Sequence, residues 1–196
     1  MPASRAARTS TTAFLERLER IDSLGQAANE MAKPVGALLG DGPVSDALRG
    51  RLLGHALHPV LARVPIGAVL SAAVLDVVQG RSAQSQSRLL MGVAWVSLAP
   101  AALSGWAEWV HADERTQRVG IAHAGLNATA AMASALSYLA RRRGWPPAAA
   151  ALTGVAAAAL SAGGVLGGHM SLVRKYASHD QPSDSEGVTR GRFEAA

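Results

Sequence analysis

Three long stretches of the chain contain no Asp, Glu, Lys or Arg. They run from Leu89 to Ala107, from Val119 to Ala140 and from Gly144 to Val173. Each is at least as long as the roughly 18 residues that mark a candidate membrane span. A soluble amphipathic helix would carry a charged or strongly polar face along every turn, and these stretches offer only Ser, Thr, Asn and His there. The pattern therefore predicts three membrane-spanning helices.

An apolar block from His58 to Val78 precedes these three stretches. It predicts a fourth membrane span, which is the first in chain order. Arg63 and Asp76 interrupt it near its ends, where long or terminal polar groups can reach the lipid headgroups. The connecting loops are short, near Gly80 to Arg88, Val110 to Arg118, and Arg141 to Pro147. Short loops favour antiparallel neighbours. The sequence therefore predicts an all-α fold, a four-helix transmembrane bundle with up-down-up-down topology.

The segments outside the bundle are more polar. Apolar residues recur at helical spacing from Ala13 to about Ala32, which predicts an amphipathic helix that Pro34 ends and that packs on the rim of the bundle or on another protein. A short helix is expected from Ser45 to Leu53. The predicted organisation is a disordered tail at 1–12, these helices at 13–54, the membrane domain at 55–177 and a disordered tail at 178–196.

Composition excludes several classes of function. The chain has no cysteine, which rules out disulfides, thiolate catalysis and iron–sulfur ligation by its own residues. Its net charge is +5, but the arginines flank apolar blocks and do not gather on one helical face, so no nucleic-acid partner is expected. Gly-rich phosphate loops, nucleophile elbows and HExxH motifs are missing. We therefore expect no catalytic residues.

The predicted topology gathers the histidines at one end of the bundle. The start of the first span, the end of the second, the start of the third and the end of the fourth share one side of the membrane. All six histidines fall on that side: His55, His58, His111, His123, His169 and His179. The opposite side carries Asp76, Gln79, Arg81, Arg88 and the run from Arg141 to Arg143. We expect Asp76 to be an interface residue or a partner of Arg81.

A histidine in a bilayer is costly unless it has a partner, so these residues are candidates for a functional site. Two imidazoles from different helices can be the axial ligands of a haem b, and we expect His123 and His169 to do this. His58 is the alternative partner, and Asn127 lies one turn deeper than His123. A second hypothesis has His58, His123 and His169 together hold a divalent metal such as zinc or copper. A third gives them only structural roles, as caps of helix ends or donors to loop carbonyls.

Glycines spaced four residues apart predict close helix packing in the last span. Gly163 and Gly167 give one Gly-x-x-x-Gly pair, and Gly164 and Gly168 give another.

Six motifs follow one another along the membrane domain: Gly54-His55-Ala56-Leu57-His58-Pro59, Val64-Pro65-Ile66-Gly67, Ala73-Val74-Leu75-Asp76, Ser104-Gly105-Trp106-Ala107-Glu108-Trp109, Val119 to Asn127, and Gly163 to His169. In this order they resemble a bacterial membrane-protein family known as domain of unknown function 2231. Ala56, Glu108 and the run Met170-Ser171-Leu172 depart from its pattern. The family has no agreed activity, but some members resemble fusions with, or neighbours of, Rieske iron–sulfur domains. The resemblance therefore implies a redox setting.

These observations lead to two functional hypotheses. The first is a haem b-binding electron-transfer component of a redox system, without chemistry of its own, whose partners are the lipid bilayer and a separate redox protein. The second is a non-enzymatic membrane anchor or scaffold that docks a soluble, Rieske-type partner. In either case we expect a multi-pass protein of the cell membrane with both termini and the histidine side in the cytoplasm, although the arginines of the opposite side argue against that orientation. The sequence does not indicate an oligomeric state.

Overall fold

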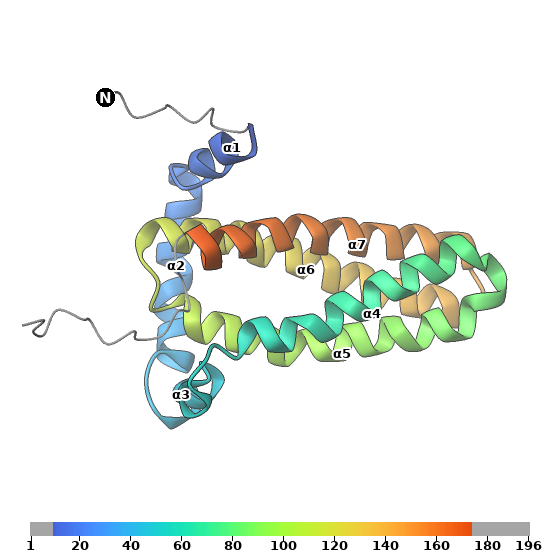
Figure 1. The fold of residues 1–196 in the computed structure, drawn as a ribbon, viewed down its shortest axis with the longest axis horizontal. Coiled ribbons are helices and arrows are strands. Elements are labelled where there is room, and N and C mark those ends of the chain that lie inside the picture. The colour runs from blue at the N-terminus through green and yellow to red at the C-terminus, as the bar shows by residue number, and fades with distance from the viewer. Residues whose placement is uncertain (1–9, 174–196) are drawn as a thin grey trace, which may run out of the picture.

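The computed structural model describes residues 10–173, which form helices and turns without any strand (Figure 1). Three short helices come first: α1 (Ser10–Leu18), α2 (Asp22–Leu39) and α3 (Pro43–Leu48), followed by a 3-10 turn at Arg51–Leu53. Four long helices follow: α4 (His58–Val78), α5 (Gln84–Trp109), α6 (Glu114–Arg142) and α7 (Pro146–Gly168). A 3-10 turn (Gly80–Ala83) links α4 to α5, and a π-helical turn (His169–Val173) extends α7.

The four long helices form an antiparallel bundle. Each packs on its neighbours in the chain, and α4 also packs on α7, which closes the ring. Figure 1 shows them side by side, with α1, α2 and α3 at one end of the bundle. We call these three helices the collar and the opposite end of the bundle the far end. The predicted four-helix, up-down-up-down architecture is confirmed.

The outer surface of the bundle is apolar. The four helices contain between 21 and 29 residues, against the about 20 needed to cross the hydrocarbon core of a bilayer. Val77, Leu89 and Val96 point outward with 86, 69 and 66 % of their surface exposed. Monomeric soluble proteins rarely expose so large an apolar surface to water. All four predicted spans are thus long and apolar enough to cross a membrane, consistent with a multi-pass membrane protein in contact with lipid.

Small residues hold the bundle together. The main buried cluster contains alanines from all four helices, among them Ala72, Ala94, Ala130 and Ala156, around the larger Met91. In a bilayer, helix association depends on close packing because the lipid tails are as apolar as the side chains. Alanine allows the backbones to approach closely.

The collar differs from the single helix predicted at 13–32. Two helices are present, and α2 continues through Pro34 to Leu39. Its buried residues Ala28 and Val35 pack against Trp109 at the end of α5, so the predicted packing on the rim of the bundle is confirmed. These contacts offset the hydrogen bond that Pro34 removes. Of the predicted tails, 1–9 and 178–196 lie outside the described residues, and 10–12 begin α1.

A buried polar network closes the far end of the bundle. It joins side chains from all four long helices: Asp76 of α4, Gln84 and Ser87 of α5, Arg141 of α6, and Thr153 of α7. At its centre the Arg141 guanidinium and the Asp76 carboxylate form an ion pair whose side chains are 0 and 6 % exposed. The predicted pairing of Asp76 with Arg81 is therefore wrong. The antiparallel return of α6 brings Arg141 to Asp76 across 65 positions of sequence.

Candidate functional site

A cavity of about 640 Å³ lies mainly between α4, α5 and α6, and it reaches the outer surface of the bundle at Trp95 and Val96, which also line it and are 54 and 66 % exposed. Its walls are largely apolar and include Pro65, Ile66, Trp106, Trp109 and Leu160. The polar side chains that face it are those of His58, His123 and Asn127. A mostly apolar cavity of this size with a few convergent polar groups is typical of a cofactor or small-molecule site.

His58 is the first residue of α4, and its ring is held by α5. Its Nδ1 lies 2.8 Å from the carbonyl oxygen of Ala101. A carbonyl only accepts, so Nδ1 carries the proton and Nε2 keeps a free lone pair. The ring lies over Gly105, where an added Cβ would come within 2.9 Å of both Cε1 and Nδ1. Glycine at this position therefore leaves the space that the His58 ring occupies.

His123 is held in the same way by α7. Its Nδ1 lies 2.8 Å from the carbonyl oxygen of Gly163, which again assigns the proton to Nδ1. An added Cβ at Gly167 would lie 3.2 Å from its Cε1. One turn along α6, Asn127 donates its Nδ2–H to Nε2 of His123 at 2.9 Å. Nε2 of His123 is therefore a hydrogen-bond acceptor, and the Asn127 amide that donates to it also donates to the His123 carbonyl at 2.9 Å.

The two imidazoles lie close together. The centroids of the His58 and His123 rings are 6.1 Å apart, and their planes are at 80°. His123 lies nine residues after the start of α6, which corresponds to a depth of about 14 Å along the helix. His123 therefore lies well inside the bundle, whereas His58 lies at the start of α4, next to the loop that precedes it.

The structure separates His169 from this pair. Its Nε2 lies 2.9 Å from Oε1 of Glu19, and both side chains are buried. His169 does not line the cavity, so His58, the alternative partner in the sequence-based hypothesis, is the histidine beside His123. Among residues 10–173 no three His, Cys, Asp or Glu side chains are grouped to hold a metal ion.

The loop histidines have structural partners. His111 bonds through Nε2 to the carbonyl of Gly40 at the end of α2, which ties the α5–α6 loop to the collar. His55 bonds through Nδ1 to the carbonyl of its neighbour Ala56. These contacts agree with the hypothesis that some of the histidines serve only to fix loops.

Two tryptophans that were not among the predicted site residues shape the end of the cavity. Trp106 and Trp109 both line it, and their rings meet edge to face at 5.0 Å. The Trp109 Nε1–H donates to the carbonyl of Gln117, which fixes α5 to the start of α6. Their spacing of three residues, which places both on one face of a helix, was the available signal.

Glu108 is an unusual buried acid next to this site. It is only 3 % exposed, and neither carboxylate oxygen has a hydrogen-bond partner among the described residues. The positive charge of Arg49 acts on it, and the backbone amide of His58 lies nearby. A buried carboxylate is stable only where such positive groups compensate it. Glu108 therefore lies close to the start of α4, which carries His58.

Comparison with known proteins yields no relative. No protein-family model matches the chain, and no curated protein or solved structure matches it either. Inference about function therefore rests on the geometry of the site, with the motif resemblance as an additional expectation.

Proposed function

We propose that this protein is a membrane electron-transfer component that holds haem b between His58 and His123. One observation carries the proposal: the two imidazoles come from different helices, and a backbone carbonyl holds the Nδ1–H of each. Metal-ligating histidines are usually oriented in this way, with the second ring nitrogen left for the metal. This leaves Nε2 of His58 and of His123 as the unprotonated ring nitrogens, through which the two side chains would hold the iron of a haem.

The donor set favours haem over a bare metal ion. Zinc sites use three or four protein ligands, and this cavity offers two imidazoles and one amide. Haem brings four nitrogens of its own and needs only axial ligands from the protein. The cavity volume of about 640 Å³ and its aromatic and aliphatic walls suit a large, flat, apolar group. Asn127 would release Nε2 of His123 when the iron binds.

In this function the protein would hold the haem and shield it from water. Bound haem supplies the chemistry, which is the gain and loss of one electron. The carbonyls of Ala101 and Gly163 fix the two ring planes, and the apolar walls keep water from the site. The motif resemblance and its Rieske connection support a separate redox protein as the electron partner. No catalytic side chain is assigned.

Absorption spectroscopy tests the proposal directly. The full chain, purified in detergent from cells supplied with a haem precursor, should show a Soret band and, after dithionite, the sharp bands of six-coordinate haem. His58→Ala and His123→Ala should each abolish the six-coordinate spectrum. His169→Ala and His111→Ala are matched controls and should keep it, because their partners are Glu19 and Gly40. A flat spectrum of the unaltered protein would refute haem binding. If His169→Ala lost the six-coordinate spectrum and His58→Ala kept it, the haem would be assigned to His123 and His169 instead.

A scaffold function is the second candidate, and the collar favours it. Leu38 and Leu52 are 82 and 84 % exposed, and Val44 lies between them in sequence with 69 % exposed. These apolar residues belong to the segment that covers the histidine end of the bundle. Two results together would favour this function. The unaltered protein would show a flat absorption spectrum, and it would bind a soluble redox protein that the Leu38→Ser variant no longer binds.

The proposed location is the cell membrane, with both termini on the cytoplasmic side. This orientation keeps the long, charged segment that precedes the first span on the cytoplasmic side. The arginines of the far end favour the opposite orientation. A reporter fused to the carboxyl terminus, active only in the cytoplasm, should be active, and an inactive but folded fusion would reverse the assignment.

A further inference from the structure

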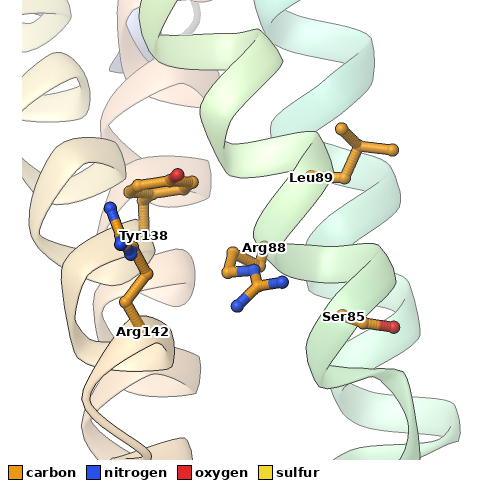
Figure 2. A pocket seen from close by; sticks show the side chains of 5 residues that line it. All are labelled: Ser85, Arg88, Leu89, Tyr138 and Arg142. Atoms are coloured by element: carbon orange, nitrogen blue, oxygen red, sulfur yellow. The ribbon is translucent and has the colours of Figure 1, made fainter.

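A second cavity, of about 460 Å³, lies at the far end of the bundle between α5 and α6. Five residues line it: Ser85, Arg88, Leu89, Tyr138 and Arg142. Figure 2 shows that Arg88 points from α5 toward α6, where Tyr138 and Arg142 stand one turn apart. Two guanidinium groups and one phenol therefore border a single space, and no residue that lines it also lines the histidine cavity.

No carboxylate of the described chain neutralises these two arginines. Neither Arg88 nor Arg142 takes part in an ion pair or a hydrogen bond within the described residues. Asp76 is the only acid among the far-end residues, and it is already paired with Arg141. Two like charges around one cavity repel each other unless an anion lies between them. The arrangement therefore has the charge and the space for an anion.

The cavity wall is positioned by the helix packing. Tyr138 lies against Gly92 of α5, where an added Cβ would be 3.4 Å from the tyrosine ring. This contact holds the phenol between the two helices at the level of the arginines. The Tyr138 hydroxyl has no hydrogen-bond partner among the described residues, and it can donate to an anion.

The position of the cavity points to a lipid as the source of the anion. Arg88 lies four residues after the start of α5, and Arg142 is the last residue of α6, so both lie near the ends of spans. Tyrosine and arginine favour this headgroup level of a bilayer. Leu89, which also lines the cavity, is 69 % exposed on the lipid-facing surface. A molecule bound here therefore borders the acyl chains.

We propose that Arg88 and Arg142 bind the phosphate of an anionic phospholipid, with the Tyr138 hydroxyl as a further donor. Guanidinium groups bind phosphate oxygens with paired hydrogen bonds, and basic pockets between transmembrane helices bind lipid headgroups in this way. Free phosphate has the same chemistry, but it would gain nothing from the apolar wall at Leu89. The bound lipid would bridge α5 and α6 where their charges otherwise repel.

Native mass spectrometry of the full chain can test the site, with phosphatidylglycerol and phosphatidylcholine added as competing lipids. The unaltered protein should retain phosphatidylglycerol in preference. Each nearby arginine contributes about fivefold to anionic-lipid binding, so Arg88→Gln with Arg142→Gln should weaken retention about 25-fold. Arg81→Gln with Arg143→Gln removes the same charge from the same end, outside the cavity, and should weaken it little. Circular dichroism must show the same helix content in all variants.

Three outcomes would overturn the proposal. The unaltered protein could show no preference for phosphatidylglycerol, or the control pair could lose as much as the cavity pair, which would leave only a general charge effect. Inorganic phosphate at millimolar concentration could displace the lipid completely and bind alone with the same dependence on Arg88, which would make free phosphate the ligand. If the double variant does not fold, Tyr138→Phe and Arg88→Lys replace it, and each should reduce retention severalfold while the helix content is unchanged.

Discussion

Removal of Arg141 should strongly destabilise the bundle, and Arg141→Met is the most informative substitution at the far end. Its guanidinium donates to Gln84 and Thr153 at 2.9 Å each and forms the ion pair with Asp76. Methionine keeps most of the length of the side chain but loses every one of these bonds. The Asp76 carboxylate would then be a buried charge without an ionic partner. Its one remaining hydrogen bond would be the one that Ser87 donates.

The magnitude follows from the burial of the pair. Breaking a buried ion pair by removing one partner costs about 3–5 kcal/mol, because the remaining charge is left uncompensated. The lower end, about 3 kcal/mol, applies here because Ser87 still donates to Asp76 and the pair lies near the end of a span. Arg81→Met is the matched control. Arg81 is exposed and has no ion pair among the described residues, so its loss should change the free energy of unfolding by less than about 0.5 kcal/mol.

Unfolding in mixed micelles, followed by circular dichroism as the fraction of denaturing detergent rises, measures both variants. The double variant Asp76→Leu with Arg141→Met should be less destabilised than Arg141→Met alone, since an apolar pair of similar volume removes the unpaired charge. Equal effects of Arg141→Met and Arg81→Met would refute the network as a stabilising element. Additive losses in the double variant would show that the two residues do not interact.

Two glycine substitutions test the histidine end, with Gly125→Ala as a common control because an added Cβ there meets nothing within 4 Å. Gly105→Ala should displace the ring of His58, because its Nδ1 would lie 2.9 Å from the new Cβ. The haem spectrum should then change from six- to five-coordinate, while the helix content stays the same. Gly120→Ala would place a Cβ 2.4 Å from Cδ1 of Trp109, and overpacking of this kind should cost about 1–3 kcal/mol in the same unfolding assay. A normal spectrum in the first variant, or unchanged stability in the second, would contradict the described packing.

The membrane domain was predictable because lipid constrains a sequence more than water does. A span must largely exclude charges over about 20 residues, and even α4, which has Arg63 and Asp76 near its ends, has the bounds expected from its hydrophobic block. Short loops then leave little choice of topology. The collar was less predictable because its boundaries depend on tertiary contacts. Glu19, between α1 and α2, bonds to His169, and Val35 packs under the bundle beyond Pro34, and neither contact has a local sequence signal.

The polar partners were the hardest part to predict. Topology correctly assigns residues to an end of the bundle, but the rotation and depth of each helix decide which of them meet. Asp76 was expected to be an interface residue or a partner of Arg81, whereas Arg141 of α6 pairs with it. In the same way His169 was assigned to His123 by its position at the end of α7, but His169, the first residue of the π-helical turn there, bonds to Glu19.

Both cavity histidines nevertheless share a local pattern that a sequence can show. His58 bonds to the carbonyl of Ala101 and lies over Gly105, and His123 bonds to the carbonyl of Gly163 and lies over Gly167. In each case the glycine follows the residue with the accepting carbonyl by four positions. The backbone N–H of the glycine therefore donates to that same carbonyl within the helix. A side chain at that position would cover the carbonyl, and glycine exposes it to a ring from the next helix. The Gly163–Gly167 pair, which predicted only close packing, therefore also orients an imidazole. A small residue followed by glycine four positions later, opposite a histidine on the adjacent span, is thus a sequence signal for an oriented histidine in a membrane bundle.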